Sequence, residues 1–128
     1  MKLADAAGEI YSGLLDLTRD GGPGNFMVVS SGDIYVQFAG NPGNTHVTCE
    51  AISNEYLPEK QRMTQKGIKK LENLGFALGG DKIENFSRAY EVTGENQARE
   101  LADLTMRILR EVYGLKPATE LQIEVSLE

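Results

Sequence analysis

Apolar residues near the start of the chain recur every three to four positions, which is the spacing of one face of an amphipathic helix. This stripe consists of Leu3, Ala7, Ile10, Leu14 and Leu17, with Ala6 and Tyr11 beside it. The segment Asp20-Gly21-Gly22-Pro23-Gly24 then predicts a turn, because glycine adopts unusual backbone angles and proline lacks an amide donor. The pattern therefore predicts a first helix that begins near Leu3 and ends before this turn.

The following thirty residues change to a period of two, which is typical of strands with one apolar face. Three strands are predicted, at Phe26 to Val29, at Ile34, Val36 and Phe38, and at Val47, Cys49 and Ala51. The segments between them are short and rich in turn-forming residues, namely Ser31-Gly32-Asp33 and Gly40-Asn41-Pro42-Gly43-Asn44. Since such short connections join antiparallel neighbours, we expect a three-stranded meander.

The second half of the chain alternates between the two periods. Pro58 is expected to open a second helix, ended by Gly75, with an apolar face of Thr64, Ile68 and Leu71. A strand is predicted from the alternation of Phe86, Arg88, Tyr90 and Val92 with Ser87, Ala89 and Glu91. Its expected partner is Phe76-Ala77-Leu78, joined to it by a loop that contains Gly79-Gly80-Asp81.

A third helix and a last strand complete the pattern. Thr93 is expected to cap the helix, which Gly114 and Pro117 end and whose buried face is Ala98, Leu101, Ala102, Thr105, Ile108, Leu109 and Val112. The last strand places Leu121, Ile123, Val125 and Leu127 on one face and Gln122, Glu124 and Ser126 on the other. The sequence thus predicts a single α+β domain over residues 1–128, an antiparallel sheet with helices packed on it, in the order α-β-β-β-α-β(β)-α-β.

Composition and charge narrow the classes of function. The 128 residues carry a formal net charge of -6, which disfavours general binding to nucleic acid or to an anionic membrane. Cys49 is the single cysteine, so an internal disulfide and a zinc site built on several thiolates are excluded. The first residues, Met1-Lys2-Leu3-Ala4-Asp5, lack the apolar core of a secretory signal, and no apolar run approaches the length needed to span a bilayer, so we expect a cytoplasmic protein.

Several residues invite a catalytic or ligand-binding interpretation, but their spacing does not favour it. His46 and Cys49 are three apart on a predicted strand, so their side chains project to opposite faces and Cys49 is expected to be a buried structural residue. The glycines Gly21-Gly22-Pro23-Gly24 precede a strand rather than a helix, unlike a phosphate-binding loop. Glu50, Glu55 and Glu59 are expected to be solvated, and no calcium-loop pattern occurs. We therefore predict no catalytic, cofactor-binding or metal-binding residue.

Residues 60–70 reverse the charge of the rest of the chain. They contain Lys60, Arg62, Lys66, Lys69 and Lys70 and no acid. At helical spacing, four of these (all but Lys60) gather opposite the predicted apolar face of the second helix. The favoured interpretation is a solvated helix face. The alternative is a docking surface for an acidic protein segment or, less favoured, for a nucleic-acid backbone.

The order of predicted elements resembles the type III secretion chaperone-like fold, in a branch of small bacterial domains described as sensory-transduction-regulator-like. The segments that carry this resemblance are Tyr35-Val36-Gln37-Phe38, Ala51-Ile52-Ser53-Asn54-Glu55-Tyr56-Leu57, Leu71-Glu72-Asn73-Leu74-Gly75-Phe76, Asn85-Phe86-Ser87-Arg88 and Ile108-Leu109-Arg110-Glu111-Val112-Tyr113-Gly114-Leu115. The resemblance implies a non-enzymatic, often dimeric protein-binding domain, whose better-known relatives hold partly unfolded secretion substrates. It implies no catalytic residue.

Two hypotheses of function follow from the sequence. The first is a protein-binding or chaperone-like adaptor with a protein partner of unknown identity and an unknown binding site, which acts as a homodimer. Leu121, Ile123 and Val125 would then bury either against the core of their own chain or against a second subunit. The second is a small enzyme or ligand-binding domain whose polar site is assembled from distant residues, such as Tyr35, Glu50, Arg88 and Tyr90.

Overall fold

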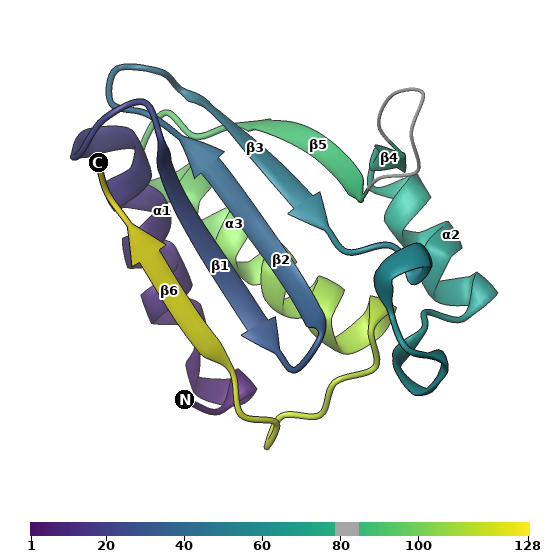
Figure 1. Ribbon diagram of the computed structural model, residues 1–128. Helices are drawn as coiled ribbons and strands as arrows, with labels where there is room; N and C mark the ends of the chain where they lie inside the picture. The colour runs from purple at the N-terminus through teal and green to yellow at the C-terminus, as the bar shows by residue number, and fades with distance from the viewer. Residues whose placement is uncertain (79–84) are drawn as a thin grey trace.

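The computed structural model describes residues 1–78 and 85–128 and shows an α+β fold, as the sequence predicts (Figure 1). The helices are α1 (Ala7–Arg19), α2 (Gln65–Asn73) and α3 (Glu95–Arg107), the last continued by a π-helical turn, Ile108–Val112. Short 3₁₀ turns cover Leu3–Asp5, Asn54–Tyr56 and Glu59–Gln61. The strands are β1 (Asn25–Ser31), β2 (Ile34–Gly40), β3 (His46–Ala51), β4 (Ala77–Leu78), β5 (Phe86–Glu91) and β6 (Gln122–Ser126).

The strands form one antiparallel sheet in the order β4-β5-β3-β2-β1-β6. The predicted meander is present as β1, β2 and β3, and its first turn closes at the pair Ser31↔Ile34. The predicted pairing of residues 76–78 with the later strand is confirmed by the pair Ala77↔Ser87. The loop expected to contain Gly79-Gly80-Asp81 lies outside the described residues. The last strand returns to the other side of the meander, where β6 pairs with β1.

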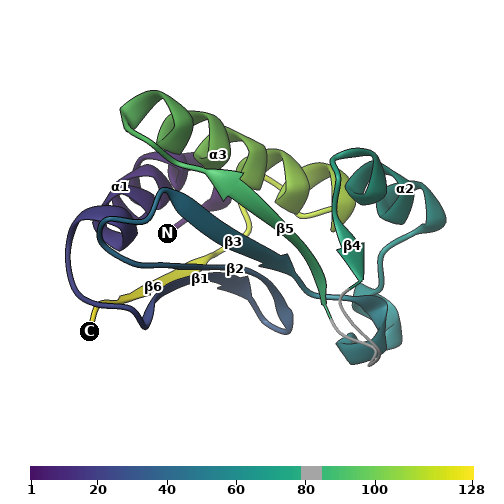
Figure 2. The same cartoon turned by 90° about the horizontal axis from the view of Figure 1, so that it is seen from above.

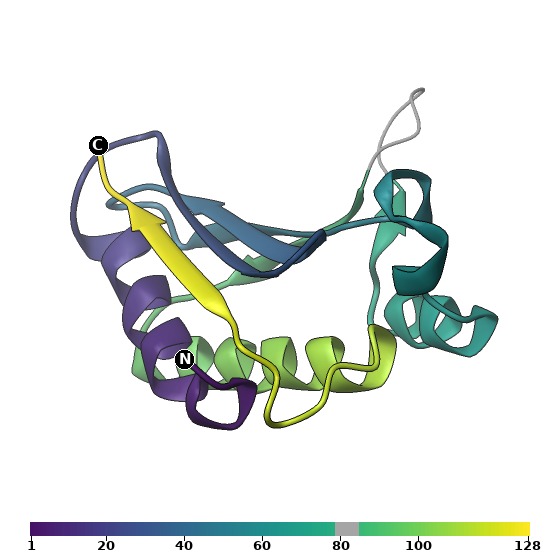
Figure 3. The same cartoon turned by 60° about the horizontal axis from the view of Figure 1, so that its bottom comes forward.

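Helices α1 and α3 lie side by side against one face of the sheet (Figures 2 and 3). Many side chains on this face are fully buried, among them Met27, Val36, Phe38 and Cys49. Within the described ranges, no helix covers the opposite face of the sheet (Figure 3). Helix α2 lies apart from this helical layer, at the end of the sheet beside β4 (Figure 1).

The predicted start of the second helix is wrong. Pro58 precedes only the 3₁₀ turn Glu59–Gln61, and α2 begins seven residues after Pro58, at Gln65. The Thr64 hydroxyl accepts a hydrogen bond from the Gly67 N–H at 3.1 Å and caps the helix there. The side chain of Asn54 bonds both the N–H and the carbonyl of Met63, so it holds the preceding residues in a loop.

The other helix starts also differ slightly from the prediction. Residues Leu3–Asp5 form a separate 3₁₀ turn, so α1 begins at Ala7. The N-cap of α3 is Gly94 in an extended conformation, without a side-chain cap, and not Thr93. The chain stays extended there because the Val92 N–H still bonds the Thr45 carbonyl at 2.7 Å, which continues the strand past β5.

The last strand buries its apolar face only partly within the chain. Leu121 is fully buried and Ile123 packs against the core, whereas Val125 is 38% exposed. Because β6 is an edge strand, no further strand among the described residues lies beside Val125 to complete its burial.

A buried amide ties the end of α1 to the start of β1. Asn25 is 1% exposed, and its Nδ2 donates to the carbonyls of Leu17 at 3.1 Å and Asp20 at 2.6 Å. Its Oδ1 accepts from the N–H groups of Gly22 at 3.0 Å and Glu128 at 2.9 Å. All four hydrogen-bonding positions of the amide are therefore used, as a buried polar group requires.

We expect Asn25→Ala to lower the free energy of unfolding by about 3 kcal/mol, because several backbone groups lose their partner. Urea denaturation followed by circular dichroism measures this loss. Asn44→Ala is the matched control, since the Asn44 Oδ1 accepts one exposed bond from the His46 N–H, and it should cost about 1 kcal/mol or less. Equal losses for the two variants would contradict the structural role given to Asn25.

We expect Cys49→Ser to cost about 1–3 kcal/mol of unfolding free energy, because a hydroxyl would replace a thiol at a fully buried position. Differential scanning calorimetry would register this as a lower Tm. Thr48→Ser, on the neighbouring exposed position, should change the unfolding free energy by no more than about 0.5 kcal/mol. A Cys49→Ser protein as stable as Thr48→Ser would show that the site tolerates a hydroxyl.

Candidate functional site

The structure separates His46 from Cys49, as the sequence predicts. His46 is exposed, with its Nδ1 3.0 Å from a carboxylate oxygen of Glu91, while Cys49 lies in the core. Burial raises the pKa of the Cys49 thiol far above its ordinary value, and the neighbouring Glu50 carboxylate raises it further. The thiol therefore stays protonated and is a poor nucleophile.

The four residues of the enzyme hypothesis do not converge. Tyr35 and Glu50 belong to the uncovered face of the sheet, whereas Arg88 and Tyr90 share the helix side with Cys49, which pairs with Arg88. The Arg88 guanidinium lies 4.3 Å from the centre of the Tyr90 ring and donates to the Leu74 carbonyl. The four side chains therefore lie on two opposite faces of the sheet and do not form one polar site.

The acidic and glycine-rich candidates are also dispersed. Glu50 accepts a bond from Gln37 at 2.8 Å on the sheet, while Glu55 and Glu59 lie in two separate 3₁₀ turns. Residues 21–24 form a loop that leads into β1. No group of three potential metal ligands occurs among residues 1–78 and 85–128. No helix in the same ranges has the length and apolarity needed to cross a membrane.

The basic segment divides into parts with different environments. Lys66 and Lys69 are exposed on α2, while Lys60 and Arg62 precede the helix and are also exposed. Arg62 donates from Nε to the Leu57 carbonyl at 3.2 Å. The predicted single basic face of four residues is thus wrong, because Arg62 is not part of α2.

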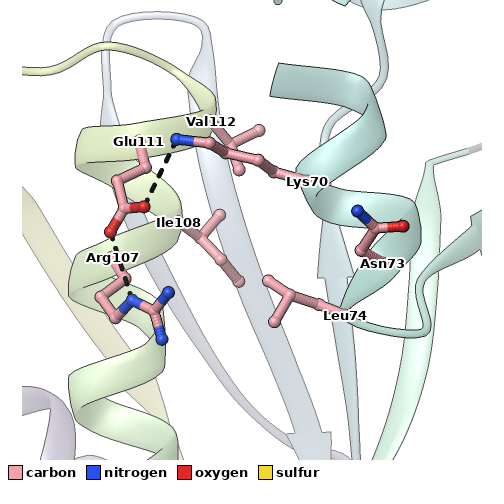
Figure 4. Close-up of a pocket in the computed structure, with 7 residues that line it drawn as sticks. All are labelled: Lys70, Asn73, Leu74, Arg107, Ile108, Glu111 and Val112. Atoms are coloured by element: carbon pink, nitrogen blue, oxygen red, sulfur yellow. Dashed lines mark hydrogen bonds and ion pairs between the residues drawn. The ribbon is translucent and has the colours of Figure 1, made fainter. Parts of the chain in front are cut away.

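Two hollows lie on the two sides of α2. The first, which we call the α2–α3 cleft, has a volume of about 200 Å³ and an apolar floor of Leu74, Ile108 and Val112 (Figure 4). At its rim, Glu111 bonds Lys70 at 3.4 Å and Arg107 at 3.2 Å. The hydrogen bond from Arg107 is the main cause that holds the pKa of Glu111 below its usual value. The cations of this cleft are therefore already neutralised in part.

The second hollow, the α2–β4 groove, is larger, at about 520 Å³. Helix α2 contributes one wall, strands β4 and β5 another, and the 3₁₀ turn after β3 a third. Its lining residues are mainly apolar on the strands and polar on the turn, and they are Ser53, Asn54, Glu55, Ile68, Glu72, Phe76, Ala77, Leu78 and Phe86. Leu78 is 53% exposed here, which is unusual for a large apolar side chain on a sheet.

Ser53 is the unusual polar residue of the groove. It is 4% exposed, and its Oγ has no hydrogen-bond partner in the described part of the chain. Its backbone N–H donates to the Oδ1 of Asn85 at 3.2 Å, and the Nδ2 of Asn85 in turn donates to the Tyr35 hydroxyl at 2.6 Å. The backbone at Ser53 is thus held in place while its side-chain hydroxyl remains unpaired.

The sequence drew attention to the segment 51–57 and to residues 76–78, but not to the groove that they form together. A single serine after a strand has no signature, and the unpaired state of its hydroxyl depends on neighbours distant in the chain. Gly67 marks the close approach of α2 to the turn after α3, but the sequence alone does not reveal its role. A Cβ at this position would lie 2.7 Å from the Val112 carbonyl oxygen, so glycine is required there.

Comparison with known families agrees with the architecture described above. The family model TY-Chap3, described as T3SS (YopN, CesT) and YbjN peptide-binding chaperone 3, matches residues 3–126. Neither the search of curated proteins nor the search of solved structures finds a significant match. The matched range includes every helix and strand of the fold. The chain therefore belongs to the TY-Chap3 family of T3SS and YbjN peptide-binding chaperones.

Proposed function

We propose that this protein is a non-enzymatic, chaperone-like adaptor that holds an extended segment of a partner protein in the α2–β4 groove. The observation that carries this proposal is the apolar lining of the groove, in which the Leu78 side chain is 53% exposed. An apolar hollow of this size accommodates one or two large side chains. Membership of a peptide-binding chaperone family supports a peptide as the occupant.

The position of the groove favours an extended partner. Strand β4 lies at the edge of the sheet, and an extended segment beside such a strand gains main-chain hydrogen bonds in addition to side-chain pockets. Because main-chain bonds are independent of sequence, this mode suits a protein that holds partly unfolded segments. Ile68 of α2 and Phe86 of β5 would add apolar contacts to those of Leu78 on β4.

The alternative of a small enzyme receives less support. Its four candidate residues lie on opposite faces of the sheet, and the Cys49 thiol is buried and protonated. We further propose that the adaptor works in the bacterial cytoplasm, since a free buried cysteine and an acidic composition suit a reducing, soluble environment.

We also propose that two copies associate around a twofold axis. Strand β6 is an edge of the sheet, and an open edge tends to pair with another strand unless it is protected. Val125 is exposed at this edge, while Phe26, 40% exposed, lies on the uncovered sheet face. The β6 edge and the uncovered sheet face are thus the two candidate surfaces for self-association. We favour the β6 edge, because β6 contacts α1 and pairing there would continue both the sheet and the apolar layer beneath it.

We expect Leu78→Asp to weaken peptide binding roughly tenfold, because an apolar contact is lost and a charge must be desolvated. An array of immobilised peptides of diverse sequence would identify a binder, whose affinity is then measured by fluorescence anisotropy. Phe26→Asp is the matched control, since it changes another exposed apolar residue, 40% exposed against 53% for Leu78, outside the groove. If Phe26→Asp weakens binding and Leu78→Asp does not, the site lies on the uncovered face of the sheet instead.

We expect sedimentation equilibrium at micromolar concentration to give about twice the 14.0 kDa chain mass. Val125→Asp should shift the protein to the monomer, because a charge at the β6 edge opposes strand pairing. Phe26→Asp should leave the dimer intact. Dissociation by Phe26→Asp alone would move the contact to the sheet face, and a monomeric unmodified protein would contradict the dimer.

A further inference from the structure

The two hollows beside α2 differ in the charge that they offer to a ligand. In the α2–α3 cleft, the Glu111 carboxylate forms ion pairs with both Lys70 and Arg107 (Figure 4). In the α2–β4 groove, Glu55 lies on the 3₁₀ turn and Glu72 on α2, one turn after Ile68. Both carboxylates are exposed, and neither forms an ion pair or hydrogen bond with another described residue. The groove therefore presents two uncompensated negative charges around an apolar floor.

The chain as a whole adds to this field, because its net charge is -6 and none of the three α2 cations, Lys66, Lys69 and Lys70, lines the groove. A cationic segment would be attracted toward the molecule at long range and would find unpaired carboxylates at the groove rim. An acidic segment would be repelled both at long range by the net charge and at the groove rim by the two carboxylates. The charge of the groove thus discriminates between the two kinds of segment.

The Ser53 hydroxyl supplies a second, independent indication of a ligand. A buried hydroxyl without a partner costs free energy, and such groups in folded proteins usually find one. Ser53 lines the groove but its Oγ is covered, so a polar group of a bound segment can become its partner if the groove lining shifts as the segment binds. This hydroxyl would fix the register of the segment, while the apolar lining holds its central side chain.

We propose that the α2–β4 groove selects protein segments in which an apolar residue is flanked by lysine or arginine, with Glu55 and Glu72 pairing with the flanking cations and Ser53 bonding the segment's polar backbone. This inference rests on the proposed function, since it assumes that the groove holds a protein segment. It goes further in naming the chemistry of that segment.

Two blocked peptides test the selection directly. Both carry the same central leucine and phenylalanine, flanked by lysines in one peptide and by glutamates in the other. We expect the lysine peptide to bind roughly tenfold more tightly at low ionic strength, and this ratio to shrink as salt is added. Fluorescence anisotropy at two salt concentrations measures both effects.

Variants assign the preference to the groove. Glu55→Gln with Glu72→Gln should reduce the ratio to about twofold or less, whereas Glu95→Gln with Glu124→Gln, an equal change of charge elsewhere, should leave most of it. Ser53→Ala should weaken both peptides about threefold to tenfold while leaving Tm unchanged or higher, because an unpaired hydroxyl is removed from the free protein. A purely structural serine would instead lower Tm.

The outcomes separate this inference from the proposed function. Equal affinity for the two peptides, or a preference that survives the groove variants, would overturn the charge selection, while sensitivity of binding to Leu78→Asp would still support the groove as the site. If the protein binds other peptides through the groove but neither of these two, the inference is also overturned. Absence of any peptide binding would overturn both proposals.

Discussion

Burial of one apolar face of the sheet beneath α1 and α3 is the interaction on which the rest of the structure depends. Side chains alternate along a strand, so Met27, Val36 and Phe38 enter the core together and their neighbours face away from it. Because most of the large apolar residues of the sheet are on one side, the helices cover that side and leave the other uncovered. The one-sided pattern thus determines both the core and the surfaces that remain available to a partner.

The short length of α2 gives the molecule its candidate site. This helix contacts the turn after α3 instead of the middle of the sheet, and Gly67 lets the two backbones approach closely. Helix α2 therefore stands at the end of the sheet with a hollow on each side. One hollow has compensated charges around Glu111, and the other combines Leu78 with two carboxylates and a Ser53 hydroxyl that have no partner among the described residues.

Buried polar groups hold the periphery of this arrangement in place. The amide of Asn25 joins the end of α1, the following loop and the end of the chain. The Tyr113 hydroxyl donates to the Ile52 carbonyl at 2.6 Å, and burial raises the pKa of this phenol. Ile52 directly precedes Ser53, so this bond helps to position the groove wall. Apolar burial is non-directional, whereas these hydrogen bonds fix the position of the groove wall relative to the core.

The sequence by itself determined the number, type and order of the main elements and the inward position of Cys49, because these follow from local hydrophobic periods. It did not locate the start of α2, where the Thr64 cap and the side-chain bonds of Asn54 outweighed the local preference of Pro58 for a helix start. Only the tertiary structure decided which charges are compensated and that the Ser53 hydroxyl has no partner within residues 1–78 and 85–128. Both depend on residues that are distant in the chain and meet only when the sheet is covered, and no local pattern encodes such meetings.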